Sequence, residues 1–144
     1  MIKVTVSIDI HRPAADIFSY ISNFANNSKW QSGVTDAYFT TDPPVRRGSG
    51  YNQVARFFGR KIESSFEVIG YEPGRLIKAA GKTKPLSLAI TRMIEQVVEG
   101  SKVTTIVEGD MIGLLKFAEP LLQKRLQRSI EKEHKKLKKL LEKI

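Results

Sequence analysis

Few residues of this chain have the types and spacing that chemistry requires. Histidine occurs twice, at positions 11 and 134, and cysteine does not occur. Two histidines so far apart, without a matching carboxylate pattern, predict no metal site. The sequence contains no HExxH, GxSxG, phosphate-binding loop or GxGxxG motif either. We therefore expect no metal and no cofactor, and any chemistry must come from isolated side chains.

The most varied side chains lie in the stretch DIHRPAADIFSYISNFANNSKW, from Asp9 to Trp30. Asp9 and His11 share a strand face with lysine, threonine and serine, so we expect His11 to be exposed rather than catalytic. His134 lies one residue away from the apolar register of a C-terminal helix. That position predicts an exposed or partly buried imidazole.

Arg92 is the charge that is most suggestive of a functional site. It lies in LSLAITRMIEQVV, where the residues of its parity are Leu88, Ile90 and Ile94. If this parity faces inward, the buried guanidinium requires a carboxylate in the fold, or an acidic or carbonyl group on a ligand. In the other register the alternate residues face inward and Arg92 is solvated. The sequence leaves both registers open.

The elements that position these residues must come from a single domain, residues 1–144. The apolar fraction is 41% and the charged fraction 27%, as in soluble globular proteins. No apolar run reaches the roughly 18 residues that a bilayer span needs, and the alternating N-terminus does not resemble a secretory signal. With cysteine absent, we expect a cytoplasmic protein.

The net charge of +9 belongs mostly to one element. Positions 123 to 143 contain nine Lys or Arg residues and three Glu residues, which gives this segment a net charge of +6. A basic surface of this kind attracts anionic partners. The rest of the chain is nearly balanced.

The order of elements follows from hydrophobic periodicity. Residues 2–10 alternate as a strand, and Pro13 starts the first of two short helices that end near Trp30. About six strands joined by short loops follow, which favours antiparallel pairing. From Leu114 the period is helical, with Pro120 expected to kink or restart the helix in its first turns. The sequence thus predicts an α+β fold, a curved antiparallel sheet of about seven strands wrapped around a long C-terminal helix.

Three stretches together resemble the START-like, or helix-grip, superfamily (SRPBCC, Bet v 1-like), in its polyketide cyclase/dehydrase-like branch. They are VSIDIHRPAADIFSYISNFANNSKW, GSGYNQVARFFGRKIESSFEVIGYEPGRLI and VTTIVEGDMIGLLKFAEPLLQKRLQRSIEKEHKKLKKLLE. The resemblance implies an apolar cavity between sheet and helix. It also implies binding of lipids, quinones or polyketide-like molecules, with cyclisation or dehydration in some members.

Within that fold, core and cavity wall are the same surface, so the inward aromatic residues are the candidate ligand contacts. A mostly apolar pocket uses a few polar groups to orient its ligand. The expected contacts are Phe18, Phe24, Trp30, Tyr51, Gln53, Phe57, Phe66, Arg92, Phe117 and Leu121. For the aromatic members, plain core packing is the alternative.

Three functions follow. The first is binding or transport of a small hydrophobic molecule. The second is a cyclase/dehydrase-type enzyme in which Arg92, helped by Tyr51, stabilises an oxyanion, although the sequence suggests no base. The third is docking on an anionic membrane or acidic protein through Lys132–Lys143. Nucleic acid is not expected, because the lysines lack interleaved aromatic residues. The oligomeric state stays open.

Overall fold

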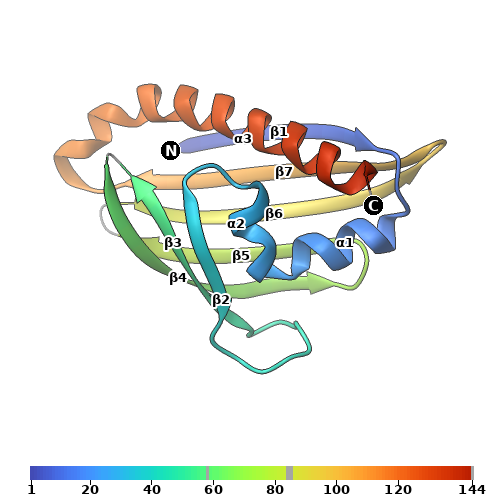
Figure 1. Cartoon of the computed structure of the whole chain (residues 1–144). Coiled ribbons are helices and arrows are strands. Elements are labelled where there is room, and N and C mark those ends of the chain that lie inside the picture. The colour runs from blue at the N-terminus through green and yellow to red at the C-terminus, as the bar shows by residue number, and fades with distance from the viewer. Residues whose placement is uncertain (58, 84–85, 144) are drawn as a thin grey trace.

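The computed structural model describes residues 1–57, 59–83 and 86–143. In this part of the chain, one antiparallel sheet of seven strands curves around the helices, which lie on its concave face (Figure 1). The strand order is β1-β7-β6-β5-β4-β3-β2. The strands are β1 (Ile2–Ile10), β2 (Val34–Phe39), β3 (Gly50–Phe57), β4 (Arg60–Glu72), β5 (Leu76–Thr83), β6 (Leu86–Val97) and β7 (Gly100–Met111). The α+β helix-grip architecture expected from the sequence is confirmed.

Two short helices follow β1, as the periodicity predicted. They are α1 (Ala14–Ser22) and α2 (Asn27–Trp30), separated by the 3-10 turn η1 (Phe24–Asn26). Pro13 immediately precedes α1, where its missing N–H group costs no helical hydrogen bond. The apolar residues of α1 then recur at helical spacing and are buried against the sheet.

The C-terminal helix begins later than the sequence suggested. A 3-10 segment, η2 (Gly113–Ala118), comes first, and α3 runs over Glu119–Glu142. Pro120 lies in the first turn of α3, so of the two expected outcomes, a kink or a restart, the structure shows the restart. Proline is accepted there because the first N–H groups of a helix have no intrahelical partner. The Glu119 carboxylate accepts hydrogen bonds from the Met111 amide and the Met1 ammonium, both at 2.9 Å. No helix in the described residues is long and apolar enough to cross a membrane.

The core has two parts along the length of α3. One is aromatic: the Tyr51 ring stacks on Phe24 at 3.9 Å and on Phe66 at 5.1 Å between centroids. The other is aliphatic and packs β1 and β7 against the first turns of α3, with Val4, Val107 and Leu122 among its members. The polar and charged groups described next lie where these two parts meet.

Candidate functional site

A cavity of about 370 Å³ lies between the sheet and the N-terminal two-thirds of α3. Its walls come from the segment after α2 and from β2, β3, β6, β7 and α3. The apolar lining consists of Val34, Ala55, Leu88, Ile90, Val107, Leu122, Leu126 and Ile130. The polar lining consists of Gln31, Ser32, Gln53, Arg56, Arg92, Thr105, Arg125, Ser129 and Glu133. The site therefore offers a ligand an apolar surface with a polar region.

Arg92 is buried at this cavity, with 6% of its surface exposed. In β6 it shares a face with the inward-pointing Ile90 and Ile94. Of the two registers that the sequence left open, the structure therefore shows the one that buries the guanidinium. Its Cζ lies 4.9 Å from the centroid of the Trp30 ring, a cation–π contact. The Nε atom has no hydrogen-bond partner. Burial lowers the pKa of Arg92, while Tyr51 and Glu133 oppose that shift.

Glu133 supplies a carboxyl group to the same cavity. One oxygen accepts a hydrogen bond from the Ser32 amide at 2.9 Å. Burial raises the pKa of Glu133 to about 7, against the lowering effects of that hydrogen bond, Arg92 and Ser129. This group can therefore gain or lose a proton near neutral pH.

His134 is buried, with 1% of its surface exposed, so the expectation of an exposed or partly buried imidazole is wrong. The inward arc of α3 is wide enough to carry residues 133 and 134 side by side. The Nδ1–H group donates to the Ile130 carbonyl at 2.8 Å, which leaves Nε2 to accept from the Thr105 hydroxyl at 2.6 Å. Burial, followed by the charge of Arg92, lowers the pKa of His134 to about 4. A neutral imidazole with both nitrogens engaged is a structural group.

The sequence of residues 1–142 matches the model of a protein family described as polyketide cyclase / dehydrase and lipid transport. The chain belongs to this family, which confirms the predicted resemblance to the polyketide cyclase/dehydrase-like branch of the START-like proteins. No curated protein matches it in sequence. Solved structures show the same fold in proteins of low identity.

Three solved structures illustrate how widely this family fold is shared. A START superfamily protein from Mycobacterium smegmatis has 13% identity and a TM-score of 0.84, and 99% of each chain is covered. TTHA0849 from Thermus thermophilus has 15% identity and a TM-score of 0.77, with 95% of this chain and 94% of the other covered. The di-domain ARO/CYC protein BexL, from the BE-7585A biosynthetic pathway, has 16% identity and a TM-score of 0.79. The match covers 99% of this chain but 47% of BexL.

The residues predicted for the site of this cyclase/dehydrase-family protein fall into four groups. Arg92 and Gln53 line the cavity, and the Gln53 oxygen accepts a hydrogen bond from the Asn27 amide at 2.9 Å. The aromatic residues pack in the core instead of lining the cavity, and they are Phe18, Phe24, Trp30, Tyr51 and Phe66. Burial raises the pKa of Tyr51 to about 12, although Arg92 opposes the shift, so its phenol stays protonated. The side chain of Phe57 lies outside the described part of the structure.

Phe117 and Leu121 do not face the cavity, which corrects their predicted placement. Their side chains are 86% and 65% exposed. Phe117 belongs to η2 and precedes α3, while Leu121 lies about 100° around the helix from the inward Leu122. Sequence reasoning selected these two residues and missed Glu133 as a site residue. The available signal was a carboxylate in the apolar register of the helix.

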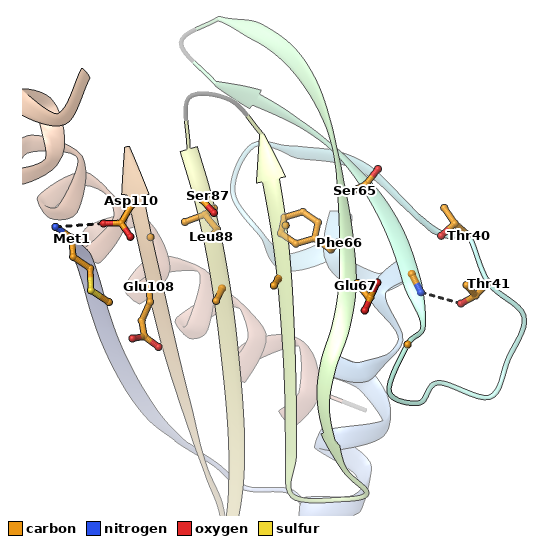
Figure 2. A pocket seen from close by; sticks show the side chains of 16 residues that line it. Met1, Thr40, Thr41, Ser65, Phe66, Glu67, Ser87, Leu88, Glu108 and Asp110 are labelled. Atoms are coloured by element: carbon orange, nitrogen blue, oxygen red, sulfur yellow. Dashed lines mark hydrogen bonds and ion pairs between the residues drawn. The ribbon is translucent and has the colours of Figure 1, made fainter. Parts of the chain in front are cut away.

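A second hollow, of about 710 Å³, lies on the outer face of the sheet (Figure 2). Glu67 and Glu108 have the strand parity opposite to that of the buried Phe66 and Val107, so they project from this face. Asp110 also lines the hollow. Figure 2 shows the sheet in front of the helices here, so this acidic hollow is separate from the internal cavity. Within the described residues, no group of three His, Asp or Glu side chains is placed to hold a metal ion.

Proposed function

We propose that this protein binds a small hydrophobic molecule that carries a carbonyl or carboxylate group. The observation that carries the proposal is Arg92, a buried guanidinium whose Nε lacks a partner, at a cavity that combines aliphatic walls with a polar region. A buried guanidinium N–H group that lacks a hydrogen bond is costly. A ligand oxygen at Arg92 would reduce that cost and orient the molecule.

No carboxylate among the described residues, Glu133 included, forms an ion pair with Arg92. The two groups nevertheless influence each other's pKa across the cavity. Below pH 7 the Glu133 carboxyl is largely protonated and can donate a hydrogen bond. The site then presents a cation and a neutral donor, which suits a carboxylate or a polarised carbonyl group.

The volume also supports a small ligand. A cavity of about 370 Å³ falls at the lower end of the roughly 300–1,000 Å³ typical of small-molecule sites. Aliphatic side chains from β6, β7 and α3 would contact the apolar body of the ligand. Because burial of apolar surface is not directional, this part of the site selects for size and hydrophobicity, while Arg92 selects for the polar group.

A matched pair of probes tests the proposal. We expect decanoic acid to raise the melting temperature more than 1-decanol does, because only the acid has an anionic group for Arg92. In Arg92→Met the two probes should give similar shifts, whereas the exposed control Arg60→Met should behave as wild type. Native mass spectrometry of the purified protein would reveal a ligand that copurifies. If neither probe shifts the wild-type melting temperature and no molecule copurifies, the proposal is wrong.

A second candidate function is supported by Glu133. Cyclase/dehydrase-type chemistry needs a base, and a carboxyl group with a pKa of about 7 is suited to that role near neutral pH. Glu133 would remove a proton from the carbon beside a carbonyl group, and Arg92 would stabilise the enolate oxygen that forms. The reaction is a proton transfer, so it needs no additional oxidant or reductant.

Deuterium exchange measures this second function directly. With a hydrophobic 1,3-diketone in D₂O, NMR should show exchange at the central carbon accelerated by the protein. We expect Glu133→Gln to slow the exchange about a hundredfold or more, while the exposed control Glu131→Gln keeps the wild-type rate. Equal rates for Glu133→Gln and wild type would remove Glu133 from this role.

Two further proposals concern the domain organisation and the cellular location of the protein. We propose that residues 1–144 form one domain, supported by a single sheet that pairs the first strand with the last. We also propose a cytoplasmic location, supported by the cysteine-free composition.

A further inference from the structure

A group of large apolar side chains is exposed where β7 leads into α3. Phe117 and Leu114 are 86% and 85% exposed. The full group, here called the apolar knob, consists of Ile112, Leu114, Leu115, Phe117 and Leu121. Exposed apolar residues are ordinary when scattered singly, but five within ten positions mark an interaction surface. Figure 1 shows this segment at the end of the molecule opposite the β6–β7 turn.

The knob continues into a basic ridge along the exposed side of α3. Leu121 is followed on the same side of the helix by Arg128, Lys132, Lys135 and Lys139, at spacings of seven, four, three and four residues. All of these side chains are exposed. Lys116 lies within the knob segment, and Lys124 follows it. The apolar group is thus bordered by cations, the pattern of surfaces that bind anionic membranes.

Glu131 and Glu142 are exposed on α3 but do not belong to the ridge, and other acidic groups lie on the sheet. Glu67 and Glu108 project from the outer face of the sheet, at the hollow shown in Figure 2. The two carboxylates nearest the knob in sequence, Asp110 and Glu119, both contact the Met1 ammonium. The ridge positions themselves are all cationic. A second copy of this chain facing the same ridge would be repelled by like charge, so a homodimer through this surface is disfavoured.

We propose that the apolar knob inserts into a bilayer containing anionic phospholipid while the basic ridge contacts the headgroups. The inward arc of α3 is already packed on the sheet, so the helix does not insert along its length. Leu122, Arg125 and Leu126, in the first turns after the knob, line the internal cavity. Docking therefore brings this end of the cavity to the membrane surface. The inference goes beyond the proposed ligand binding and stands or fails independently of it.

The absence of cysteine in the chain allows a clean test. The variant Phe117→Cys provides one site for an NBD fluorophore at the knob. The matched control is Val98→Cys, at a fully exposed apolar residue in the β6–β7 turn at the other end of the molecule. Each labelled protein is titrated with phosphatidylcholine vesicles, with or without 30% phosphatidylglycerol, and binding is measured separately by flotation. The melting temperature of each protein confirms that it is folded.

We expect a blue shift and an intensity increase at position 117 with the anionic vesicles, and no change at position 98. Leu114→Ser should weaken flotation at least tenfold. Replacing Lys132 by Gln should weaken it about fivefold, the effect of one charge at an anionic surface, while Lys61→Gln on the sheet should not. The proposal is overturned by equal changes at both positions or by equal binding to neutral vesicles. It is also overturned by a shift at position 117 that rises with protein concentration without vesicles, because that result indicates a second copy.

Discussion

Replacing Glu133 by glutamine should change how the stability of this protein depends on pH, because two neighbouring buried groups have opposite effects. The pKa of His134 falls from 6.5 to about 4, so the unfolded chain binds the extra proton first as pH decreases. The stabilisation linked to the neutral His134 is complete above pH 6.5 and is lost as pH falls towards 4. The pKa of Glu133 rises from 4.5 to about 7, so its contribution is complete below pH 4.5 and is lost as pH rises towards 7.

The two contributions have similar size. Each pKa moves by about two and a half units from its ordinary value, which corresponds to about 3 kcal/mol of unfolding free energy. Between pH 4.5 and 6.5 they act in opposite directions and nearly cancel in the wild-type protein. In Glu133→Gln only the His134 contribution remains. We therefore expect the unfolding free energy of Glu133→Gln, relative to that of wild type, to increase by about 2–3 kcal/mol as the pH rises from 4.5 to 6.5.

Urea denaturation at pH 4.5, 5.5 and 6.5, followed by far-ultraviolet circular dichroism, measures this difference. The control variant Glu131→Gln removes an exposed carboxylate from the same helix, and its difference from wild type should not follow this pattern. A Glu133→Gln curve that stays parallel to the wild-type curve would refute the opposed linkage of Glu133 and His134.

Three further predictions concern packing and burial, and urea denaturation checks each of them. Leu137→Ala should lose about 2–5 kcal/mol of unfolding free energy because Leu137 is fully buried. Leu121→Ala should change the unfolding free energy by less than about 0.5 kcal/mol. Similar losses in the two variants would contradict the orientation of α3. Gly81→Ala should destabilise by about 1–3 kcal/mol, because an added Cβ would lie 2.6 Å from the Phe66 ring; wild-type stability would rule out this close approach. Arg92→Met at pH 5.5 should be at least as stable as wild type, because it removes a buried charge while Glu133 is largely protonated. A large loss of unfolding free energy would show that the fold already supplies the polar partners that the guanidinium needs.

The fold was largely predictable because its signals are local. The alternation of residues 2–10 predicts a strand with one buried face, and the structure pairs this strand with β7 in the expected antiparallel sense. Pro13 and the apolar spacing after it predict α1. At Pro120 the sequence left two outcomes open, because a proline within a periodic segment is compatible with either a kink or a helix start. The chain that precedes it, held here in η2, decides between them.

The candidate site was only partly predictable. Arg92 and Gln53 line the cavity, although the sequence left the direction of Arg92 open and only the register of β6 decides it. Phe117 was selected because large aromatic residues are usually buried, a tendency that does not hold at an interaction surface. Glu133 lies in the apolar register of the helix but was not predicted as a site residue. His134 was predicted to be exposed or partly buried because it lies one residue from that register, whereas the structure buries it.

The amino-acid sequence by itself determined the order of the elements, the buried face of most strands and the concentration of positive charge in the last helix. These properties depend on the period of the hydrophobic pattern and on the local composition, both of which can be read from a few neighbouring residues. Only the tertiary structure decided that Arg92, Glu133 and His134 lie together near Trp30, and that the apolar knob stays exposed. Whether a polar group is buried or an apolar one is left in solvent depends on partners distant in sequence, since their packing and charge set the free energy of each placement.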